Sequence, residues 1–379
     1  MLKKRTISKV LLLAVVLMVL ASGLALPSCQ PAKGIPRGWS GIYVGDDALF
    51  LGSMEGKLVA IDKSTQQRLW PDVPFKQKQS SGFLSGCAQG DQAVAIYGTP
   101  AVATELVYIT GYNGKMYAIN VETGALRWVY PREDELDPIV GGPVAAGDKV
   151  YFGGSDGKLY ALDAATGDEL WVFEESEGKM WGTPAVNGET LYIGSFDKKL
   201  YAVNVADGSL KWQFETEGAI VSTPLVYDDT VYFGSFDRHL YALNEADGSL
   251  RWKYQADNWF WSQPLADNGV IYAGSVDGTV HALTADKGEK VAVFDLESPV
   301  SSSPVLADGN VIVAVEAGQV YSLNVNPRQK KQLVNLEEEI YASLAAGDGV
   351  VYIHDADDVL HAMDAVSGTI LWMIKLESE

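Results

Sequence analysis

The residues best suited to binding a metal lie in the run His-Asp-Ala-Asp-Asp at 354–358. Closely spaced carboxylates are the oxygen ligands that Ca²⁺ takes, so a calcium site is one interpretation of Asp355, Asp357 and Asp358. The four histidines show no His-Glu-x-x-His spacing, and no Gly-x-Ser-x-Gly nucleophile motif is present. We therefore predict neither catalytic residues nor a resident cofactor. The histidines are His239, His281, His354 and His361.

Most other aspartates recur at equivalent places in a repeated unit, which favours a structural role because a catalytic residue is usually singular. One set falls in turns and consists of Asp156, Asp197, Asp237 and Asp277. The other set follows an apolar run and consists of Asp62, Asp163 and Asp364.

The repeated unit returns about every 40 residues. In its clearest copy, residues 181–212, Trp-Gly-Thr-Pro is followed by a β-rich run ending in Gly-Ser. A Leu-Tyr-Ala-Val-Asn run and an Asp-Gly turn then precede a second Trp. A period of this length, made only of short strands and turns, is typical of a β-propeller. Asp and Gly tolerate positive φ, so these turns predict hairpins and four strands in each unit.

Eight copies align on a position close to their ends, which Ala292 and Gln332 occupy in the sixth and seventh copies. The first interval is longer and indicates an insertion at 71–95. We predict an all-β, eight-bladed β-propeller of four-stranded antiparallel blades over residues 39–379, after a linker at 29–38. The other six copies carry Trp70, Trp128, Trp171, Trp212, Trp252 and Trp372.

The N-terminus has the layout of an export signal, with basic residues at 3–5 before a mainly apolar stretch at 10–26. Leu-Pro-Ser-Cys at 26–29 resembles a bacterial lipobox, which predicts a lipoprotein-type signal peptide at 1–28 and lipidation of Cys29. The alternative is an uncleaved anchor, because an apolar stretch of this length lies at the lower edge of what spans a bilayer. Both interpretations tether the propeller to a membrane, on its periplasmic or extracellular side.

Cys29 and Cys87 are the two cysteines of the chain. If Cys29 is acylated, Cys87 is a lone thiol. If Cys29 is not acylated, the two cysteines could form a disulfide in an oxidising compartment. Neither case supplies a metal or redox cluster.

The formal net charge of −20 argues against two classes of partner. An acidic surface repels nucleic-acid phosphates and anionic lipid headgroups. We therefore expect protein partners for a monomeric propeller.

Several copies of the repeat carry an aromatic residue three residues before their Pro position, and this set of rings is not part of the regular pattern. Because innermost strands line a propeller's channel, we expect these rings to crowd one of its mouths. Aromatic rings give a large contact area at low entropic cost, which suits capture of an extended peptide or a flat ligand. The alternative is that they plug the wide central hole. With one neighbour, the set comprises Trp39, Tyr97, Trp181, Trp259, Trp261 and Tyr341.

Residues 161–171, Ala-Leu-Asp-Ala-Ala-Thr-Gly-Asp-Glu-Leu-Trp, resemble the pyrroloquinoline-quinone-type (PQQ-like) propeller repeat. Its signature is Ala-x-Asx-x-x-Thr-Gly-x-x-x-Trp, and in that family the Trp docks one blade edge onto the next. The resemblance implies this structural role for the six Trp residues. Close copies span 118–128, 202–212, 242–252 and 362–372.

Two classes of protein carry this repeat. Exported BamB-type lipoproteins are eight-bladed, of about this length and without a cofactor, and they serve as scaffolds in outer-membrane protein assembly. Quinoprotein dehydrogenases are larger and hold PQQ and Ca²⁺ in the central funnel, often beside a Cys-Cys pair that this chain lacks. The resemblance thus implies a non-catalytic scaffold with protein partners, with a quinone-dependent dehydrogenase or a degenerate ligand-binding relative as the alternative. A small-ligand sensor acting through the aromatic set is a third interpretation.

Overall fold

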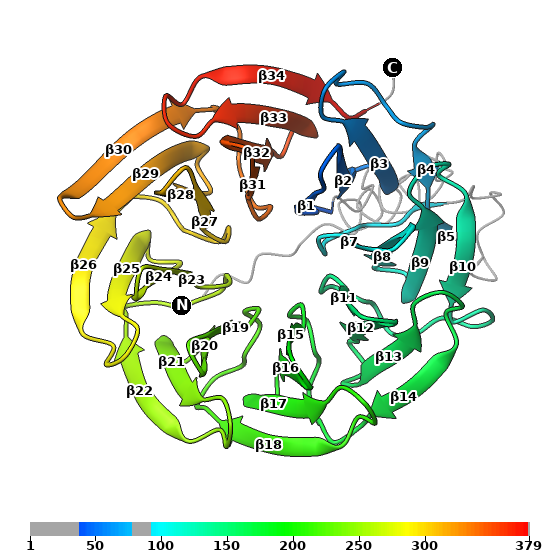
Figure 1. Cartoon of the computed structure of the whole chain (residues 1–379), viewed down its shortest axis with the longest axis horizontal. Coiled ribbons are helices and arrows are strands. Elements are labelled where there is room, and N and C mark those ends of the chain that lie inside the picture. The colour runs from blue at the N-terminus through cyan, green and yellow to red at the C-terminus, as the bar shows by residue number, and fades with distance from the viewer. Residues whose placement is uncertain (1–37, 78–91, 378–379) are drawn as a thin grey trace, which may run out of the picture.

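The computed structural model describes residues 38–77 and 92–377. In these ranges the chain forms eight four-stranded antiparallel sheets arranged as a ring (Figure 1). The predicted eight-bladed β-propeller is therefore confirmed. The predicted signal peptide, Cys29, most of the linker and Cys87 lie outside the described residues. Within the described part of the chain, no helix is long and apolar enough to cross a membrane.

Each blade runs outward from the central opening through four consecutive strands. The innermost strands are β1 (Ile42–Val44), β7 (Ala101–Ala103), β11 (Val144–Ala146), β15 (Ala185–Asn187), β19 (Leu225–Tyr227), β23 (Leu265–Asp267), β27 (Val305–Ala307) and β31 (Ala345–Gly347). The second strands are β2 (Ala48–Gly52), β8 (Leu106–Gly111), β12 (Lys149–Gly153), β16 (Thr190–Gly194), β20 (Thr230–Gly234), β24 (Val270–Gly274), β28 (Asn310–Ala314) and β32 (Val350–His354).

The third and outermost strands complete the blades. The third strands are β3 (Lys57–Asp62), β9 (Lys115–Asn120), β13 (Leu159–Asp163), β17 (Lys199–Asn204), β21 (His239–Asn244), β25 (Thr279–Thr284), β29 (Gln319–Val325) and β33 (Val359–Asp364). The outermost strands are β4 (Val73–Pro74), β10 (Leu126–Tyr130), β14 (Glu169–Phe173), β18 (Leu210–Glu215), β22 (Leu250–Gln255), β26 (Lys290–Asp295), β30 (Arg328–Asn335) and β34 (Ile370–Lys375).

Burial explains the different sequence patterns of inner and outer strands. The second strand β20, Thr-Val-Tyr-Phe-Gly, is buried along its whole length because neighbouring blades cover both of its faces. The outermost strand β18, Leu-Lys-Trp-Gln-Phe-Glu, alternates between half-buried and exposed residues because only one face is covered. The core is therefore a set of clusters, each shared by two consecutive blades, as Tyr151 of blade 3 and Leu191 of blade 4 share one.

The repeated Trp residues bridge consecutive blades. The indole Nε1–H of Trp171 donates a hydrogen bond to the carbonyl oxygen of Val205 in the next blade, 3.2 Å away. The same indole lies against Gly208, where an added Cβ would approach it to 2.6 Å. Equivalent hydrogen bonds to the next blade extend from four further residues, Trp70, Trp128, Trp212 and Trp252. Trp372 packs beside Tyr352 at the seam between blades 8 and 1.

The seventh blade departs from the predicted alignment by one residue. In regular blades the Trp pairs with the Ala of the third strand, as Trp212 pairs with Ala202. In the regular blades a bulge follows this pair, whereas in blade 7 it precedes the pair, between Val320 and Tyr321, so Lys331 rather than Gln332 stands opposite the equivalent Ser322. The prediction that Gln332 holds the Trp position was wrong, because counting residues cannot locate a bulge. The Lys331 ammonium donates to the carbonyl oxygen of Val366 in blade 8, one residue beyond the acceptor that the indoles use elsewhere, and Leu333 lies against Gly368 where other blades place an indole.

The ring closes between blades that are each built from one continuous stretch of chain. At the seam, Leu49 and Ile61 of blade 1 share a buried cluster with Leu360 of blade 8. The Arg68 guanidinium also donates to the carbonyl oxygen of Leu376, 3.1 Å away. Among residues 38–77 and 92–377, side-chain packing and hydrogen bonds therefore close the ring without exchange of a strand.

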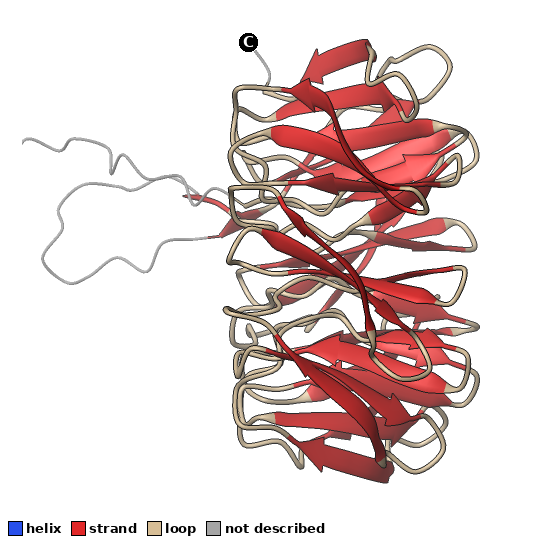
Figure 2. Ribbon diagram, turned by 90° about the vertical axis from the view of Figure 1, so that its left-hand side faces the viewer, coloured by secondary structure: helices blue, strands red, loops and turns tan. Residues whose placement is uncertain are grey.

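The predicted insertion follows Trp70. The first part of 71–95 contains β4, the short outermost strand of blade 1, which pairs with β3. A second pair, β5 (Lys76–Gln77) and β6 (Gln92–Ala93), follows. Figure 2 shows the blades from the side as a thick disc, and this pair of strands projects from one face of the disc. That face also carries the other connections from an outermost strand to the next innermost strand, and we call it the mouth face.

Candidate functional site

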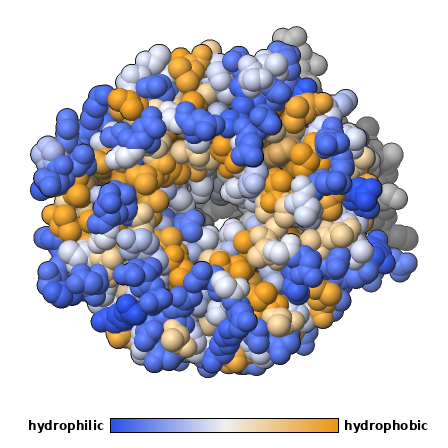
Figure 3. All heavy atoms as spheres, in the orientation of Figure 1, coloured by the Kyte–Doolittle hydropathy of each residue, from blue (hydrophilic) through white to orange (hydrophobic). Residues whose placement is uncertain are grey.

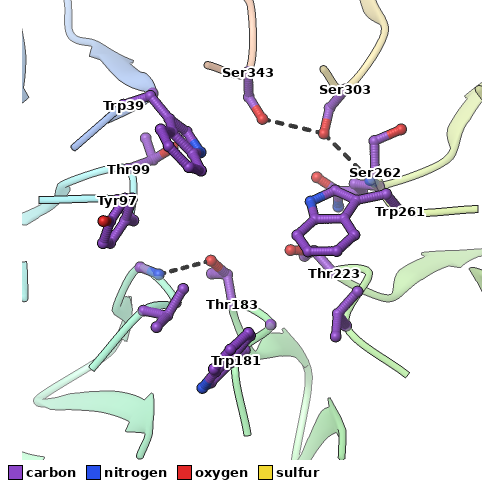
Figure 4. Close-up of a pocket in the computed structure, with 18 of the residues that line it drawn as sticks. Trp39, Tyr97, Thr99, Trp181, Thr183, Thr223, Trp261, Ser262, Ser303 and Ser343 are labelled. Carbon is purple, nitrogen blue, oxygen red and sulfur yellow. Dashed lines mark hydrogen bonds between the residues drawn. The ribbon is translucent and has the colours of Figure 1, made fainter. Parts of the chain in front are cut away.

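The connections that enter the innermost strands surround a central cavity of about 410 Å³ on the mouth face (Figure 4). Small residues let adjacent connections approach closely. A Cβ added to Gly98 would lie 2.4 Å from the Cα of Gly142, and one added to Gly141 would lie 2.6 Å from the carbonyl oxygen of Gly182. The glycines that precede β7, β11 and β15 therefore serve packing between blades.

Five of the six aromatic residues singled out from the sequence line this cavity. Trp39 and Trp261 are 41% and 39% exposed, so each presents a large part of its ring to the opening. Trp259 is not part of the lining, and its ring stacks on Phe236 with the centroids 4.5 Å apart. The lining members of the set are Trp39, Tyr97, Trp181, Trp261 and Tyr341.

The rings form two groups. The first, here the tyrosine arc, comes from blades 8, 1 and 2 and consists of Trp39, Tyr97, Tyr112 and Tyr341. In it the Trp39 ring centroid lies 4.8 Å from that of Tyr97 and 5.5 Å from that of Tyr341. Tyr112 joins through Tyr97, at 5.7 Å. These rings form one continuous wall of the cavity.

The second group, here the tryptophan arc, comes from blades 4, 5 and 6. The Phe196 ring lies 4.7 Å from Trp181 and 6.2 Å from Phe236, measured between centroids. Phe236 stacks on both Trp259 and Trp261, the latter at 5.5 Å. In Figure 4, Trp39 and Tyr97 stand across the opening from Trp261.

Tyr112, Phe196 and Phe236 were missed in the sequence. They lie at equivalent places in the turns between second and third strands, where blade 3 has Ser155 and blade 6 has Val276. In the sequence, these three residues belong to Gly-Tyr at 111–112 and to Ser-Phe-Asp at 195–197 and 235–237, where an aromatic residue stands in the turn. The repeat alignment assigns the whole turn to blade structure and therefore does not single out these aromatic residues.

Several hydroxyl groups around the cavity are engaged within the protein. Thr183 Oγ1 accepts the backbone N–H of Gly142 at 2.9 Å, and Ser303 Oγ accepts that of Gln263 at 3.2 Å. Ser343 Oγ donates to Ser303 Oγ at 3.3 Å. These bonds join consecutive blades, so these hydroxyl groups secure the ring as well as lining its opening.

Among the described residues, the cavity lining contains no Asp, Glu, Lys, Arg or His side chain. The Lys179 ammonium lies outside the lining, 5.3 Å from the centroid of the Trp181 ring, in a cation–π contact. Trp181 is also oriented by the hydrogen bond from its indole N–H to Ser155 Oγ, at 2.8 Å. The mouth is thus an aromatic and uncharged surface in a strongly acidic protein.

This lining does not fit a quinone cofactor with Ca²⁺. PQQ is a multiply charged carboxylate, and Ca²⁺ takes several oxygen ligands, typically including carboxylates. In the described part of the chain, neither basic partners for the quinone nor acidic ligands for the metal face the cavity. Among residues 38–77 and 92–377, no group of three or more His, Cys, Asp and Glu residues could hold a metal. The residues of the mouth therefore support no catalytic step through such a cofactor.

The acidic run at 354–358 is engaged at the seam between blades 8 and 1. Asp355 Oδ2 lies 2.7 Å from His361 Nε2, and Asp358 Oδ1 lies 2.8 Å from His354 Nε2. Burial raises the pKa of Asp355, but the hydrogen bonds from His361 and the Val359 amide outweigh it, and the pKa is held below its usual value. The carboxylates Asp355 and Asp358 therefore serve separate His partners and do not converge as calcium ligands.

The repeated aspartates have the same structural character. The Tyr201 hydroxyl donates to Asp197 Oδ2 at 2.6 Å, and Asp197 Oδ1 accepts the backbone N–H of Lys199. Tyr241 and Asp237 repeat the pair in the next blade at 2.7 Å. Such pairs fix the turn between the second and third strands, as the repetition in the sequence predicts.

A profile of the family "Outer membrane protein assembly factor BamB" matches residues 28–174, 160–258 and 257–331. The chain belongs to the BamB family. The match covers most of the propeller, including the aromatic residues of blades 1 to 6. The PQQ-like, BamB-type β-propeller implied by the repeat is thereby confirmed.

Solved structures agree on the fold. BamB from Moraxella catarrhalis matches with a TM-score of 0.70 and 21% identity, covering 85% of this chain and 95% of that one. The computationally designed Ika8 protein matches with a TM-score of 0.69 and 14% identity, covering 89% and 96%. At these identities the likeness shows the fold alone, since a designed protein shares it equally well. No curated protein matches this member of the BamB family.

Proposed function

We propose that this protein is an exported, membrane-tethered and non-catalytic scaffold that contacts protein partners in the assembly of outer-membrane proteins. Membership of the BamB family supports the assembly role. The lipobox-like sequence at 26–29 supports export and a lipid anchor on Cys29. The observation that carries the proposal is the mouth, where two exposed aromatic arcs surround an uncharged cavity.

The geometry favours a contact surface over a plug. If the rings only filled the central hole, they would bury one another and leave little space. Instead a cavity of about 410 Å³ lies between the arcs, and Trp39, Trp259 and Trp261 are each about 40% exposed. Trp and Tyr are among the residue types that contribute most of the binding energy at protein interfaces, and here they are exposed and clustered. The mouth is therefore the proposed partner-binding surface.

The opposite face differs from the mouth. Figure 3 shows that face, where hydrophilic side chains cover much of the outer part of the ring. Its inner hairpins carry exposed carboxylates such as Asp47, Asp148 and Asp229. This charge supports solubility and makes that face less suited to an apolar partner.

The test is crosslinking in membranes of the native host, using the full chain with a photoreactive residue at position 261. A β-barrel membrane protein or a component of its assembly machinery should be the main crosslinked product. A matched probe at Met373, which is 68% exposed on the outermost strand of blade 8, serves as the control. Equal products from both positions, or none from position 261, would contradict the proposal.

A further inference from the structure

We infer that the mouth binds an extended peptide segment whose aromatic side chains are flanked by Lys or Arg, lying across the opening from blade 3 to blade 7. The inference rests on the proposed function, because it specifies the chemistry of the protein segment that the mouth would take. It follows from the placement of the two arcs and from the charges around them.

The placement of the arcs defines a direction across the mouth. The tyrosine arc comes from blades 8, 1 and 2, and the tryptophan arc comes from blades 4, 5 and 6. In an eight-bladed ring these two sets lie opposite one another, as do the two blades between them (Figure 1). At the position of these rings, blades 3, 5 and 7 contribute Val140, Val221 and Ser301 to the lining, and in blade 5 the ring of Phe236 lies beside Trp261. The mouth is therefore a trough with two aromatic walls, and blades 3 and 7 add no ring to either wall.

An extended chain fits a trough of this shape. Aromatic-lined grooves are a common means of binding extended peptides, because the rings pack against successive side chains and require little reordering. Ring faces at Trp39 and Trp261 would contact side chains projecting to either side of the chain. The smaller side chains of Val140 and Ser301 at blades 3 and 7 would let the chain continue beyond the mouth in both directions.

The charges around the trough select the flanking residues. The connections that carry the aromatic rings also carry exposed carboxylates, so an acidic collar surrounds an uncharged mouth. Among the described residues, the cations on these connections are Lys76, Arg132 and Lys179, and Arg132 is paired with Asp168. Lys and Arg on a ligand would thus gain from the collar and from the ring faces. One exposed carboxylate from each of six connections is Glu135, Glu177, Glu217, Asp257, Glu297 and Glu338.

The alternative ligand class is a neutral oligosaccharide stacked on the rings. A sugar needs directed hydrogen bonds from the protein in addition to aromatic platforms. Here the hydroxyl groups of Thr183, Ser303 and Ser343 bond within the ring, whereas those of Ser262 and Ser301 have no partner among the described residues. A neutral sugar would gain nothing from the acidic collar, which therefore favours a cationic peptide as the ligand.

The test uses three synthetic, capped peptides with the purified chain. The first alternates Trp and Phe with Ser and carries Lys at both ends. The second replaces Lys by Glu, and the third replaces the aromatic residues by Ala. Binding is followed by fluorescence anisotropy of a dye on the peptide. We expect the first peptide to bind about tenfold or more tightly than either of the others, and its affinity to fall with added salt.

Variants of the chain locate the site. Trp261→Ala and Trp39→Ala should each weaken binding of the first peptide about tenfold, because either change removes one wall of the trough. Met373→Ala is the matched control on the outer surface. Glu297→Gln combined with Glu338→Gln should weaken binding and reduce its salt dependence, whereas Asp228→Asn with Asp229→Asn on the opposite face should not. Unfolding midpoints equal to wild type would show that the variants are folded.

The outcomes separate the peptide inference from the proposed function. Equal binding of all three peptides, or tighter binding of a glucan hexamer than of the first peptide, would overturn the inference. Loss of the crosslinked partner at position 261 would instead count against the scaffold function. If the partner crosslinks there but no aromatic, Lys-flanked peptide binds, the scaffold stands and the trough assignment fails.

Discussion

His354 Nε2 lies 2.8 Å from Asp358 Oδ1, with the two side chains 0% and 1% exposed, at the seam that closes the ring. The same carboxylate oxygen accepts the Met54 amide of blade 1 at 3.0 Å, and His354 Nδ1 lies 3.1 Å from the carbonyl oxygen of Ser40. In blades 4 and 5 a glycine, Gly194 or Gly234, stands in place of this His. The polar bridge therefore joins the last blade to the first.

Asp358→Ala should lower the free energy of unfolding by about 3 kcal/mol, because it leaves His354 and the Met54 amide buried without this partner. Urea unfolding followed by Trp fluorescence measures the change. The neighbouring exposed residue provides the control, Asp357→Asn, for which we expect a change within about 0.5 kcal/mol. Equal effects of the two substitutions would mean that the bridge does not hold the seam.

Two glycines test the contact between blades made by the repeated Trp. Gly208 and Gly188 both have positive φ, +74° and +55°, so an Ala at either strains the backbone by about 1 kcal/mol. At Gly208 the new Cβ would also lie 2.6 Å from Trp171, whereas at Gly188 nothing lies within 4 Å. Gly208→Ala should therefore cost about 1–3 kcal/mol more than Gly188→Ala. Similar thermal midpoints for both variants would contradict blade docking through this Trp.

Acid should weaken the turns held by Tyr–Asp pairs. Burial raises the pKa of Asp197, but hydrogen bonds from Tyr201, Ser176 and backbone amides outweigh it, so the pKa lies below its ordinary value of 3.8. A lowered pKa gives stability that is present above the unfolded value and lost as the pH falls through the folded value. The loss is therefore expected below a pH of 3.8.

Tyr201→Phe tests this pair, since it removes the hydroxyl that donates to Asp197. We expect about 1 kcal/mol lower stability near neutral pH, a modest figure because solvent screens the partly exposed carboxylate. The difference from wild type should shrink as the pH falls below 3.8. Tyr43→Phe in blade 1 is the matched control. A Tyr201→Phe difference that stays constant across the acid range would rule out the linkage.

The fold could be predicted from the sequence because each blade repeats the same local pattern and meets its neighbours in the same way. Strand order, blade number and the roles of Asp197 and Asp237 follow from that regularity. What the repeat could not supply lies where regularity ends. In blade 7 the bulge lies at a different place, so Lys331 stands opposite Ser322. At the seam, His354 pairs with Asp358, one of the residues that the sequence suggested as calcium ligands.

The candidate site was only partly predictable for a similar reason. Residues before each inner strand converge by repetition, which is why Trp39 and Trp261 could be placed at one mouth. Phe196 and Phe236 come from turns between second and third strands. Phe196 meets Trp181 within blade 4, and Phe236 of blade 5 meets Trp261 of blade 6, contacts that depend on the folded blades. The division into two opposite arcs depends on which blades carry rings, so it emerged only with the complete ring.

Partner binding at the aromatic mouth is tested most sharply by recovery of partner proteins from solubilised membranes, using the full-length protein and its Trp39→Ala/Trp261→Ala variant. We expect wild type and the Met373→Ala control to recover the same β-barrel or assembly component. The double variant should recover about tenfold less while unfolding at the same temperature. Undiminished recovery by the folded double variant would show that partners bind elsewhere than at the aromatic mouth.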